Sequence, residues 1–402
     1  MKILYYSSHP QLSLYAQSGP GTHIREMINA FQELGHDVLP VIMGGDKPLQ
    51  TNQKHISQKE SGLKKAIKKI VPKKIWRTLK EYKLLQFDKA AEKLLHDKIV
   101  EFNPDIVYER GAYLQTSGLN VLKLFPHIKH VTEINAPYLE EMLQFEGVDT
   151  LLKKKAITAE SRQIKESTLV SVVSTPLKKH YSQYTQTTDK IVVVPNAINE
   201  ILINIDVVLQ EKIRNQYRLS NKTVIGFVGS IFPYHGVDLL IESFAALLPK
   251  HPQIALLIVG DGQILPDLKK LTQSLHIEQH VHFTGSVKHT DVFSHINCMD
   301  ITILAKTNYF CSPVKIFEYG VLEKAIVSIS TSAIQDVLTH KKNAFLIPSA
   351  SKNELTDAIS YLLSNPEEAR RLGRKVKQDI LSNHTWIKNA QTILHLLEKH
   401  NS

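Results

Sequence analysis

The sequence predicts an α/β protein with two Rossmann-like βα domains and a ligand-binding cleft between them. Its 402 residues are too many for one ordinary domain. Short β-branched runs alternate with amphipathic stretches through the first half of the chain, and the same alternation starts afresh at Lys222. Hydrophobic residues make up 43% of the chain and charged residues 22%, which is ordinary globular usage and excludes wholesale disorder.

The first domain is expected over residues 1–198. Its strands are continuous apolar runs, as in a parallel sheet that is buried on both faces. They are predicted at Lys2–Ser8, Asp37–Met43, Asp105–Glu109, Lys129–Ile134, Leu169–Ser174 and Lys190–Val194. The clearest helix spans Thr22–Leu34, where apolar residues recur on one face and Gly35 ends the helix.

The second domain is expected over residues 199–385, with residues 199–221 as a linker because they lack a strand pattern. Strands are predicted at Thr223–Val228, Ala255–Val259, Val281–Phe283, Asp300–Leu304, Ala325–Ile329 and Ala344–Ile347. Helices are predicted at Asp238–Leu248, Leu265–Leu275, Val314–Leu322, Asn353–Leu363 and Glu367–Ser382. In such folds ligands bind outside the carboxyl ends of the strands, and we therefore search the turns there for chemistry.

Several classes of protein are excluded by composition and motif. The two cysteines, Cys298 and Cys311, are too few for a disulfide framework or a four-thiolate zinc site. The motifs H-E-x-x-H, C-x-x-C and G-x-S-x-G are absent from the sequence. No run approaches the roughly 18 apolar residues of a membrane span, and the N-terminus does not have the pattern of a signal peptide. We expect a cytoplasmic protein without a metal or a cofactor.

Two glycine turns follow predicted strands and open helices. Gly19 and Gly21 would let a ligand approach the backbone, and a helix N-terminus favours an anion or a hydroxyl-rich group. A simple tight turn explains them equally well. The turn after the first strand of the second domain holds Gly229, Ser230 and His235, and the histidine makes a phosphate site more plausible there.

The most informative segment contains Ser312, Pro313, Val314, Lys315 and Glu318. The serine is expected to cap a helix whose first residue is the proline. A lysine in the first helical turn opposes the helix dipole unless an anion binds there. The glutamate, one turn further on, could accept hydrogen bonds from ribose hydroxyls. The alternative, a solvated Lys–Glu pair on a helix surface, is left equally open.

Two further turns are expected at the same cleft. Gly260 and Asp261 close a buried strand of the second domain, although the aspartate could simply cap the turn. Glu133 and Asn135 end a strand of the first domain and carry polar side chains.

The net charge of +10 is concentrated in one segment: residues 54–83 hold eleven basic and two acidic residues, which gives +9. Apolar and basic residues alternate there at helical spacing, and Ile75, Trp76, Leu79 and Tyr82 form the second apolar face. This composition is typical of a helix that lies in an anionic membrane interface. The candidate membrane residues are Lys64, Lys65, Lys68, Lys69, Lys73, Lys74, Trp76 and Arg77. A helix that packs on its own domain is the main alternative; nucleic acid is disfavoured because no aromatic residue interrupts the basic face.

Taken in order, these motifs resemble glycosyltransferase family 4, the retaining glycosyltransferases of the GT-B fold, over nearly the whole chain. The landmarks that carry the resemblance are Gly19–Glu26, Leu34–Val38, Val107–Arg110, Glu133–Pro137, Val194–Ile198, Gly229–Asp238, Gly260–Gly262, Phe283–Val287, Ser312–Tyr319 and Trp386. The last of these would begin a helix, residues 386–402, that packs back on the first domain.

The resemblance implies an enzyme that moves a sugar from a nucleotide diphosphate sugar to an acceptor. The nucleotide would lie on the second domain, with its ribose on Glu318 and its diphosphate on the Ser312–Lys315 turn. The candidate catalytic residues are Lys315, His235, Asn135 and Glu133. The candidate substrate-binding residues are Gly19, Gly21, Gly229, Ser230, Gly260, Asp261, Gly285, Val287, Ser312, Pro313, Val314 and Glu318. With the basic segment, this predicts a glycan or lipid-linked acceptor and an enzyme on the inner face of the membrane.

The sequence departs from the common family pattern at three positions. Phe310 stands where many members carry a first glutamate, Ser230 where an arginine is usual, and His235 where a lysine is usual. Lys315 would then supply the missing positive charge. These departures leave open a catalytically weak or inactive nucleotide-sugar-binding scaffold, and more remotely a nucleotide-sugar epimerase.

Overall fold

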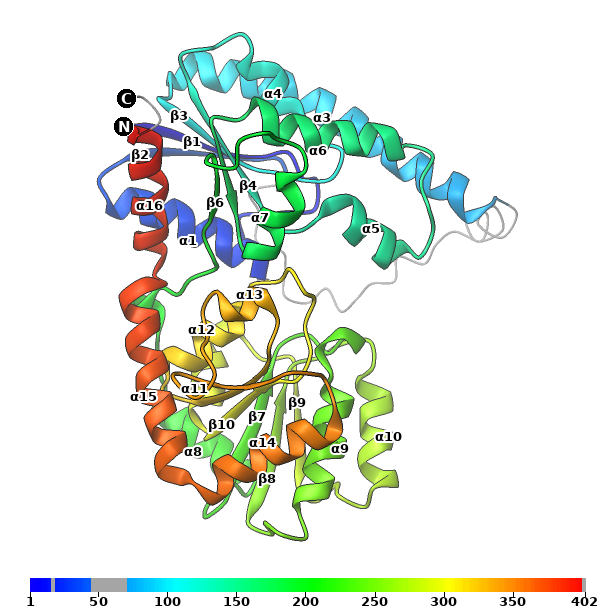
Figure 1. Ribbon diagram of the computed structural model, residues 1–402, viewed down its shortest axis with the longest axis vertical. Helices are drawn as coiled ribbons and strands as arrows, with labels where there is room; N and C mark the ends of the chain where they lie inside the picture. Colours follow the sequence, from blue (N-terminus) through cyan, green and yellow to red (C-terminus); the bar gives the residue numbers. More distant parts are fainter. Residues whose placement is uncertain (16–18, 45–70, 400–402) are drawn as a thin grey trace. The chain divides into compact units, whose positions relative to one another are not determined.

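The computed structural model describes residues 1–15, 19–44 and 71–399. The chain divides into two compact units, the first formed by Met1–Val194 with Asn389–Ser402 and the second by Pro195–Lys388. Each unit is built around a six-stranded parallel sheet (Figure 1). The α/β architecture with two βα halves therefore agrees with the sequence pattern.

The sheet of the first unit has the strand order β2-β1-β3-β4-β5-β6. Its strands are β1 (Lys2–Ser7), β2 (Asp37–Ile42), β3 (Ile106–Arg110), β4 (Lys129–Ile134), β5 (Leu169–Val172) and β6 (Ile191–Val193). Each lies within one or two residues of its predicted bounds. The apolar runs are buried on both faces of the sheet, which is why they show little alternation in the sequence.

Helices cover both faces of this sheet. They are α1 (Gly19–Glu33), α3 (Lys73–Phe102), α4 (Ser117–Leu122), α5 (Tyr138–Glu146), α6 (Lys153–Glu166), α7 (Thr175–Ser182) and the larger part of α16 (Trp386–Lys399). The apolar side of α1 is buried, and Phe31 lies edge-on to Tyr108 of β3 with 5.5 Å between the ring centroids. In α16, the carbonyl of Leu397 accepts a hydrogen bond from Lys129 Nζ at 3.3 Å.

Helix α3 turns a polar face toward its own unit. Arg77 is buried, and its Nε lies 3.0 Å from Glu81 Oε1. The sequence pattern had grouped this arginine with the lysines of the exposed face; the structure corrects that, because the buried Glu81 carboxylate draws the guanidinium inward. Ile75, Leu79 and Tyr82 are instead 46, 50 and 52% exposed.

The other candidate membrane residues lie at this end of α3 or before it. Lys73 and Lys74 are exposed at its first turn, and Trp76 is half-buried. Lys64, Lys65, Lys68 and Lys69 lie outside the described residues.

The second unit has the strand order β12-β11-β10-β7-β8-β9. The strands are β7 (Thr223–Val228), β8 (Ile254–Val259), β9 (Val281–Gly285), β10 (Ile301–Leu304), β11 (Ala325–Ile329) and β12 (Phe345–Ile347). The helices are α8 (Val207–Gln216), α9 (Val237–Leu247), α10 (Leu265–Ser274), α11 (Val292–Asn297), α12 (Val314–Val321), α13 (Ser332–Gln335), α14 (Lys352–Ser364) and α15 (Pro366–Asn383).

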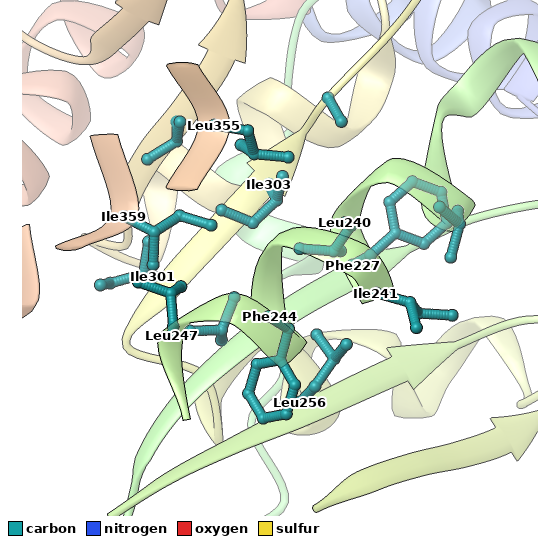
Figure 2. Close-up of a cluster of buried hydrophobic side chains, with 14 of the residues drawn as sticks. Phe227, Leu240, Ile241, Phe244, Leu247, Leu256, Ile301, Ile303, Leu355 and Ile359 are labelled. Carbon is teal, nitrogen blue, oxygen red and sulfur yellow. The ribbon is translucent and has the colours of Figure 1, made fainter. Parts of the chain in front are cut away.

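Successive residues of the central strands point to opposite faces of this sheet and enter two separate cores. Phe227 joins the core beneath α9, α10 and α14, where it lies with Leu240, Phe244 and Leu355 (Figure 2). Its neighbour Val228 belongs to the core beneath α8, α11, α12 and α15. Both faces of the sheet are thus filled, so a ligand site is to be sought in the loops at the strand ends.

Residues 199–221 are not a structureless linker. They contain α8, whose Ile213 is 3% exposed and packs in the core of the second unit. Asp206 caps this helix, accepting a hydrogen bond from the backbone N–H of Leu209 at 3.0 Å. The sequence shows no strand pattern over these residues, as expected, but helix α8 was not predicted from it.

Candidate functional site

Four neighbouring strands of the second unit end beside one another, and their loops hold the residues predicted for donor binding. The strands are β10, β7, β8 and β9, adjacent in that order. Gly229, Ser230 and His235 follow β7; Gly260 and Asp261 follow β8; Gly285 and Val287 lie at the end of β9; and Ser312, Pro313, Val314, Lys315 and Glu318 follow β10. Because parallel strands end at the same edge of a sheet, this group of loops forms one surface.

The glycines at this edge are required by close backbone packing. A Cβ atom on Gly260 would lie 2.0 Å from the carbonyl oxygen of Gly229, and one on Gly262 would lie 2.2 Å from that of Ile231. Gly229 and Gly260 also have φ angles of 138° and 133°, which side chains disfavour. The loops after β7 and β8 therefore lie directly against each other, with backbone groups at the surface.

Lys315 lies in the first turn of α12 and reaches back toward β7. Its Nζ is 4.2 Å from the centroid of the Phe227 ring, and a Cβ atom on Gly229 would lie 2.7 Å from Nζ. The ammonium is buried and makes no hydrogen bond within the described part of the chain. Burial lowers the pKa of Lys315 to about 8, against the opposing influence of Cys311 and Glu318.

The N-terminus of α12 is open. Helix α12 begins at Val314, and Pro313 occupies the N-cap position, where no side chain makes a capping hydrogen bond. The expectation that Ser312 caps this helix is therefore wrong: its Oγ accepts a hydrogen bond from the backbone N–H of Asn196 at 3.1 Å. The N-terminal end of a helix dipole, here with the Lys315 ammonium in its first turn, favours an anion.

Glu318 lies one turn beyond Lys315 and is half-buried. Burial raises the pKa of Glu318 to about 7, while the nearby Lys315 lowers it. In its ionised form, the Glu318 carboxylate can accept hydrogen bonds from neutral hydroxyl groups.

His235 has a defined protonation in this site. Its Nδ1 lies 2.6 Å from the carbonyl oxygen of Ser230. Burial and the charge of Lys315 lower the pKa of His235 to about 4. The ring is therefore neutral near pH 7, Nδ1 donates to the carbonyl, and Nε2 is left as an acceptor. Without a ligand, this histidine adds no positive charge beside Lys315.

The first unit holds a second group of predicted residues. Gly19 and Gly21 begin α1, which follows β1, and Glu133 and Asn135 lie at the end of β4. Asn135 is half-buried, whereas Glu133 is 1% exposed and accepts a hydrogen bond from His23 of α1 at 2.7 Å. Within this unit the structure thus joins the glycine turn to the end of β4 through one carboxylate.

Three residues of these sites were given no role from the sequence. Phe227 was read only as a strand residue, and His23 and Arg110 only as parts of family landmarks. Their contacts join residues that are apart in the sequence: 110 positions for His23 and Glu133, 88 for Phe227 and Lys315, and 23 for Arg110 and Glu133. The sequence feature that could have indicated such a contact is a charged residue at the end of a buried strand, as Arg110 is in β3.

Two classes of feature are absent from the described residues. Over residues 1–15, 19–44 and 71–399, no group of three or more histidine, cysteine, aspartate or glutamate side chains is arranged to hold a metal ion. Within the same ranges, none of the helices combines the length and apolar character needed to cross a membrane.

Comparison with protein families gives two matches that together span most of the chain. The model described as Glycosyltransferase Family 4 matches residues 17–200. The model described as Glycosyl transferases group 1 matches residues 210–379. The first match covers most of the first unit and ends six residues into the second, and the second match lies within the second unit.

Curated relatives are similar in sequence. An uncharacterized glycosyltransferase of Haemophilus influenzae is 27% identical over 350 residues, which is 84% of this chain and 85% of that protein. A GDP-mannose-dependent alpha-(1-6)-phosphatidylinositol monomannoside mannosyltransferase of Mycobacterium tuberculosis is 22% identical over 187 residues, covering 45% of this chain and 49% of that protein. The second similarity thus spans only about half of either protein.

Solved structures share the architecture of the whole chain. Anabaena HepE, solved in complex with UDP-glucose, has a TM-score of 0.70 and 15% sequence identity, and the alignment covers 99% of this chain and 100% of that one. At this identity the likeness shows the fold, which is GT-B.

Proposed function

The chain is a glycosyltransferase of the GT-B fold, and from this premise we propose that it is a retaining, metal-independent enzyme acting at a membrane. It takes a nucleotide diphosphate sugar as donor and transfers the sugar to a hydroxyl of a lipid-linked or glycolipid acceptor. The product belongs to a surface polysaccharide or glycoconjugate, and the enzyme binds the inner face of the cell membrane from the cytoplasm.

The observation that carries the donor site is the buried ammonium of Lys315, which has no hydrogen-bond partner among the residues that the structure describes. Removing an ammonium from water without an acceptor is costly, so such a group is retained where a ligand completes it. The aromatic face of Phe227 stabilises the cation only in part. A diphosphate beside Gly229 would accept hydrogen bonds from Nζ and from the open first turn of α12 together.

The same geometry suggests how the reaction is accelerated. Cleavage of the sugar–phosphate bond leaves a nucleoside diphosphate whose negative charge grows in the transition state. Lys315 and the N–H groups of α12 are preorganised to stabilise that charge, which is the task that a metal ion performs in other enzymes. Glu318 would hold the ribose hydroxyls and fix the position of the leaving group.

The membrane part of the proposal rests on the orientation of α3. Ile75, Leu79 and Tyr82 recur at helical spacing and are about half exposed, while Arg77 and Glu81 of the opposite side are buried. A helix that only covered its own unit would bury the apolar side instead. The outward apolar stripe, in a segment with a charge of +9 over residues 54–83, suits an anionic lipid surface.

The proposed donor site is tested by a thermal-shift panel of UDP-, GDP-, ADP- and TDP-sugars in the presence of EDTA. A donor at a hundred times its Kd should stabilise the protein by about 2.7 kcal/mol. We expect one nucleotide to give this shift, and Lys315→Ala to remove most of it. The exposed Lys306 of the same loop supplies the matched control, Lys306→Ala, which should keep the shift.

Transfer and its stereochemistry are then measured with the donor so identified. The anomeric configuration of the product, read by NMR, should match that of the donor. Lys315→Ala should lower kcat about 100-fold, corresponding to 2–3 kcal/mol of transition-state stabilisation. Donor binding without hydrolysis or transfer would favour the inactive scaffold, and the absence of any donor shift would contradict the site itself.

A further inference from the structure

The end of β4 in the first unit carries a buried carboxylate with an unusually complete set of donors. Oε2 of Glu133 accepts from His23 Nε2 and from the Tyr108 hydroxyl, each at 2.7 Å. Oε1 accepts from Arg110 Nη1 at 2.6 Å and from Asn135 Nδ2 at 2.7 Å. The four donors come from α1, from β3 and from the segment after β4.

The carboxylate is held in its ionised form. Burial alone would raise the pKa of Glu133, but His23, Arg110 and the hydrogen bonds to His23 and Asn135 bring it well below its usual range. At 1% exposure and with both oxygens doubly engaged, Glu133 has no direction left in which to meet a substrate. Its expected catalytic role is therefore not supported by its surroundings.

The neighbours of Glu133 are better placed to meet a ligand. Asn135 is half-buried, and because a carboxylate only accepts hydrogen bonds, its Nδ2 must face Glu133. Its Oδ1 is thereby turned away from Glu133 as an acceptor suited to a sugar hydroxyl. His23 lies one turn into α1, two residues after the buried Gly21 of the glycine turn.

We infer that Glu133 is a positioning residue for sugar transfer: its carboxylate orients the Asn135 amide and anchors the glycine-turn end of α1 to the strands of the sheet. The inference rests on the proposed function for its substrate, and on the contacts of the first unit alone for its geometry. The class of ligand is a hydroxyl-bearing sugar, whose O–H groups donate to Asn135 Oδ1.

The chain offers a matched control in the neighbouring strand. Glu109 of β3 is 2% exposed and its Oε2 lies 2.8 Å from His130 Nε2 of β4, so it forms a second buried carboxylate–histidine pair in the same sheet, without a contact to α1. Glu109→Gln and Glu133→Gln should both lower the melting temperature. In Glu133→Gln, an amide nitrogen replaces one carboxylate oxygen and cannot accept hydrogen bonds, so two of the four donors around residue 133 lose their acceptor. Only this variant should therefore loosen the start of α1 from the sheet.

Hydrogen exchange measured by mass spectrometry, without any substrate, tests the anchoring. We expect Glu133→Gln to raise amide exchange in the first turns of α1 about 10-fold over wild type, and Glu109→Gln to leave it unchanged. Equal exchange of α1 in the two variants would overturn the inference. If Glu133→Gln does not fold, His23→Leu, which removes one donor and keeps Arg110 and Tyr108 in place, is measured in the same way.

Kinetics of the full chain test the link to Asn135. Asn135→Ala and Glu133→Gln should each reduce kcat/KM by about 10-fold or more while the donor-induced thermal shift stays as in wild type. If the glutamate acts through the asparagine, the double variant should lose no more than the worse single variant. If the kcat/KM losses of the two single variants multiply in the double variant, the positioning role is refuted. If the wild-type protein transfers sugar to no acceptor, only the proposed function is contradicted. The hydrogen-exchange experiment still decides whether Glu133 anchors α1.

Discussion

Lys315 and Glu318 lie one helical turn apart, and the proposed donor site needs the lysine protonated and the glutamate deprotonated. The proposed diphosphate contact needs the ammonium form of the lysine, and the proposed ribose contact needs the carboxylate form of the glutamate. Burial lowers the pKa of Lys315 to about 8 and raises the pKa of Glu318 to about 7. In the unliganded protein, both groups are in the required form only in a narrow range of pH.

This predicts a bell-shaped pH dependence of kcat/KM for the donor, which reports the free enzyme. The acidic limb should fall below about pH 7 as Glu318 is protonated, and the alkaline limb above about pH 8 as Lys315 loses its charge. Lys315→Arg should flatten the alkaline limb, since a guanidinium stays charged, and Glu318→Gln should flatten the acidic limb. An unchanged profile in both variants would assign the limbs to other groups.

The protonation state of His235 could not be predicted in full from the sequence. From the sequence, His235 is expected to assist Lys315 at a phosphate site, at a position where a lysine is usual in the family. The actual ring donates through Nδ1 to the Ser230 carbonyl and is neutral because burial and Lys315 oppose its protonation. The tautomer follows from a local contact with the Ser230 carbonyl, whereas the lowered pKa depends on burial and on the Lys315 ammonium, eighty positions away in the sequence.

At the scale of the element, strands were predicted better than helices. The strands are short apolar runs, buried almost throughout in the inner strands of both sheets although mostly half-buried in the edge strand β9, and their bounds follow closely from the sequence. Helix α3 was recognised only over its basic beginning, although it continues through Phe102 as a 30-residue helix. Its mixed apolar and charged residues give no steady amphipathic pattern, because its start and its later turns bury different kinds of side chain.

The first turns of α3 lead to a prediction about lipid binding. Ile75→Ser with Leu79→Ser should reduce binding to vesicles containing anionic lipid by roughly 10-fold or more, since each apolar side chain removed from an interface costs on the order of 1.5 kcal/mol or more. Flotation measures the bound fraction. Both residues are about half exposed, so the melting temperature should not change.

The control lies on the same helix. Leu94 and Val100 are 40 and 61% exposed but lie outside the basic segment, and Leu94→Ser with Val100→Ser should leave flotation unchanged. Equal binding by all variants, or equal binding to neutral and anionic vesicles, would contradict a lipid contact at Ile75 and Leu79.

At the scale of the whole molecule, the division into two βα halves could be predicted because the alternation of strands and helices starts twice in the sequence. The grouping of the loops that we propose to bind the donor was also predictable, because glycine turns after parallel strands fall at one sheet edge. The network of the first unit was not. Glu133 meets His23 across 110 positions, and a spacing of that kind leaves no periodic signal for a reader of one sequence.

The outward stripe of Ile75, Leu79 and Tyr82 has a kinetic consequence. An enzyme held at a lipid surface through such a stripe encounters its acceptor by diffusion in two dimensions. Its rate then follows the mole fraction of acceptor among the lipids, and not the amount of acceptor per volume of solution. Adding inert lipid would slow such an enzyme by surface dilution, even though no molecule of enzyme or acceptor had been removed.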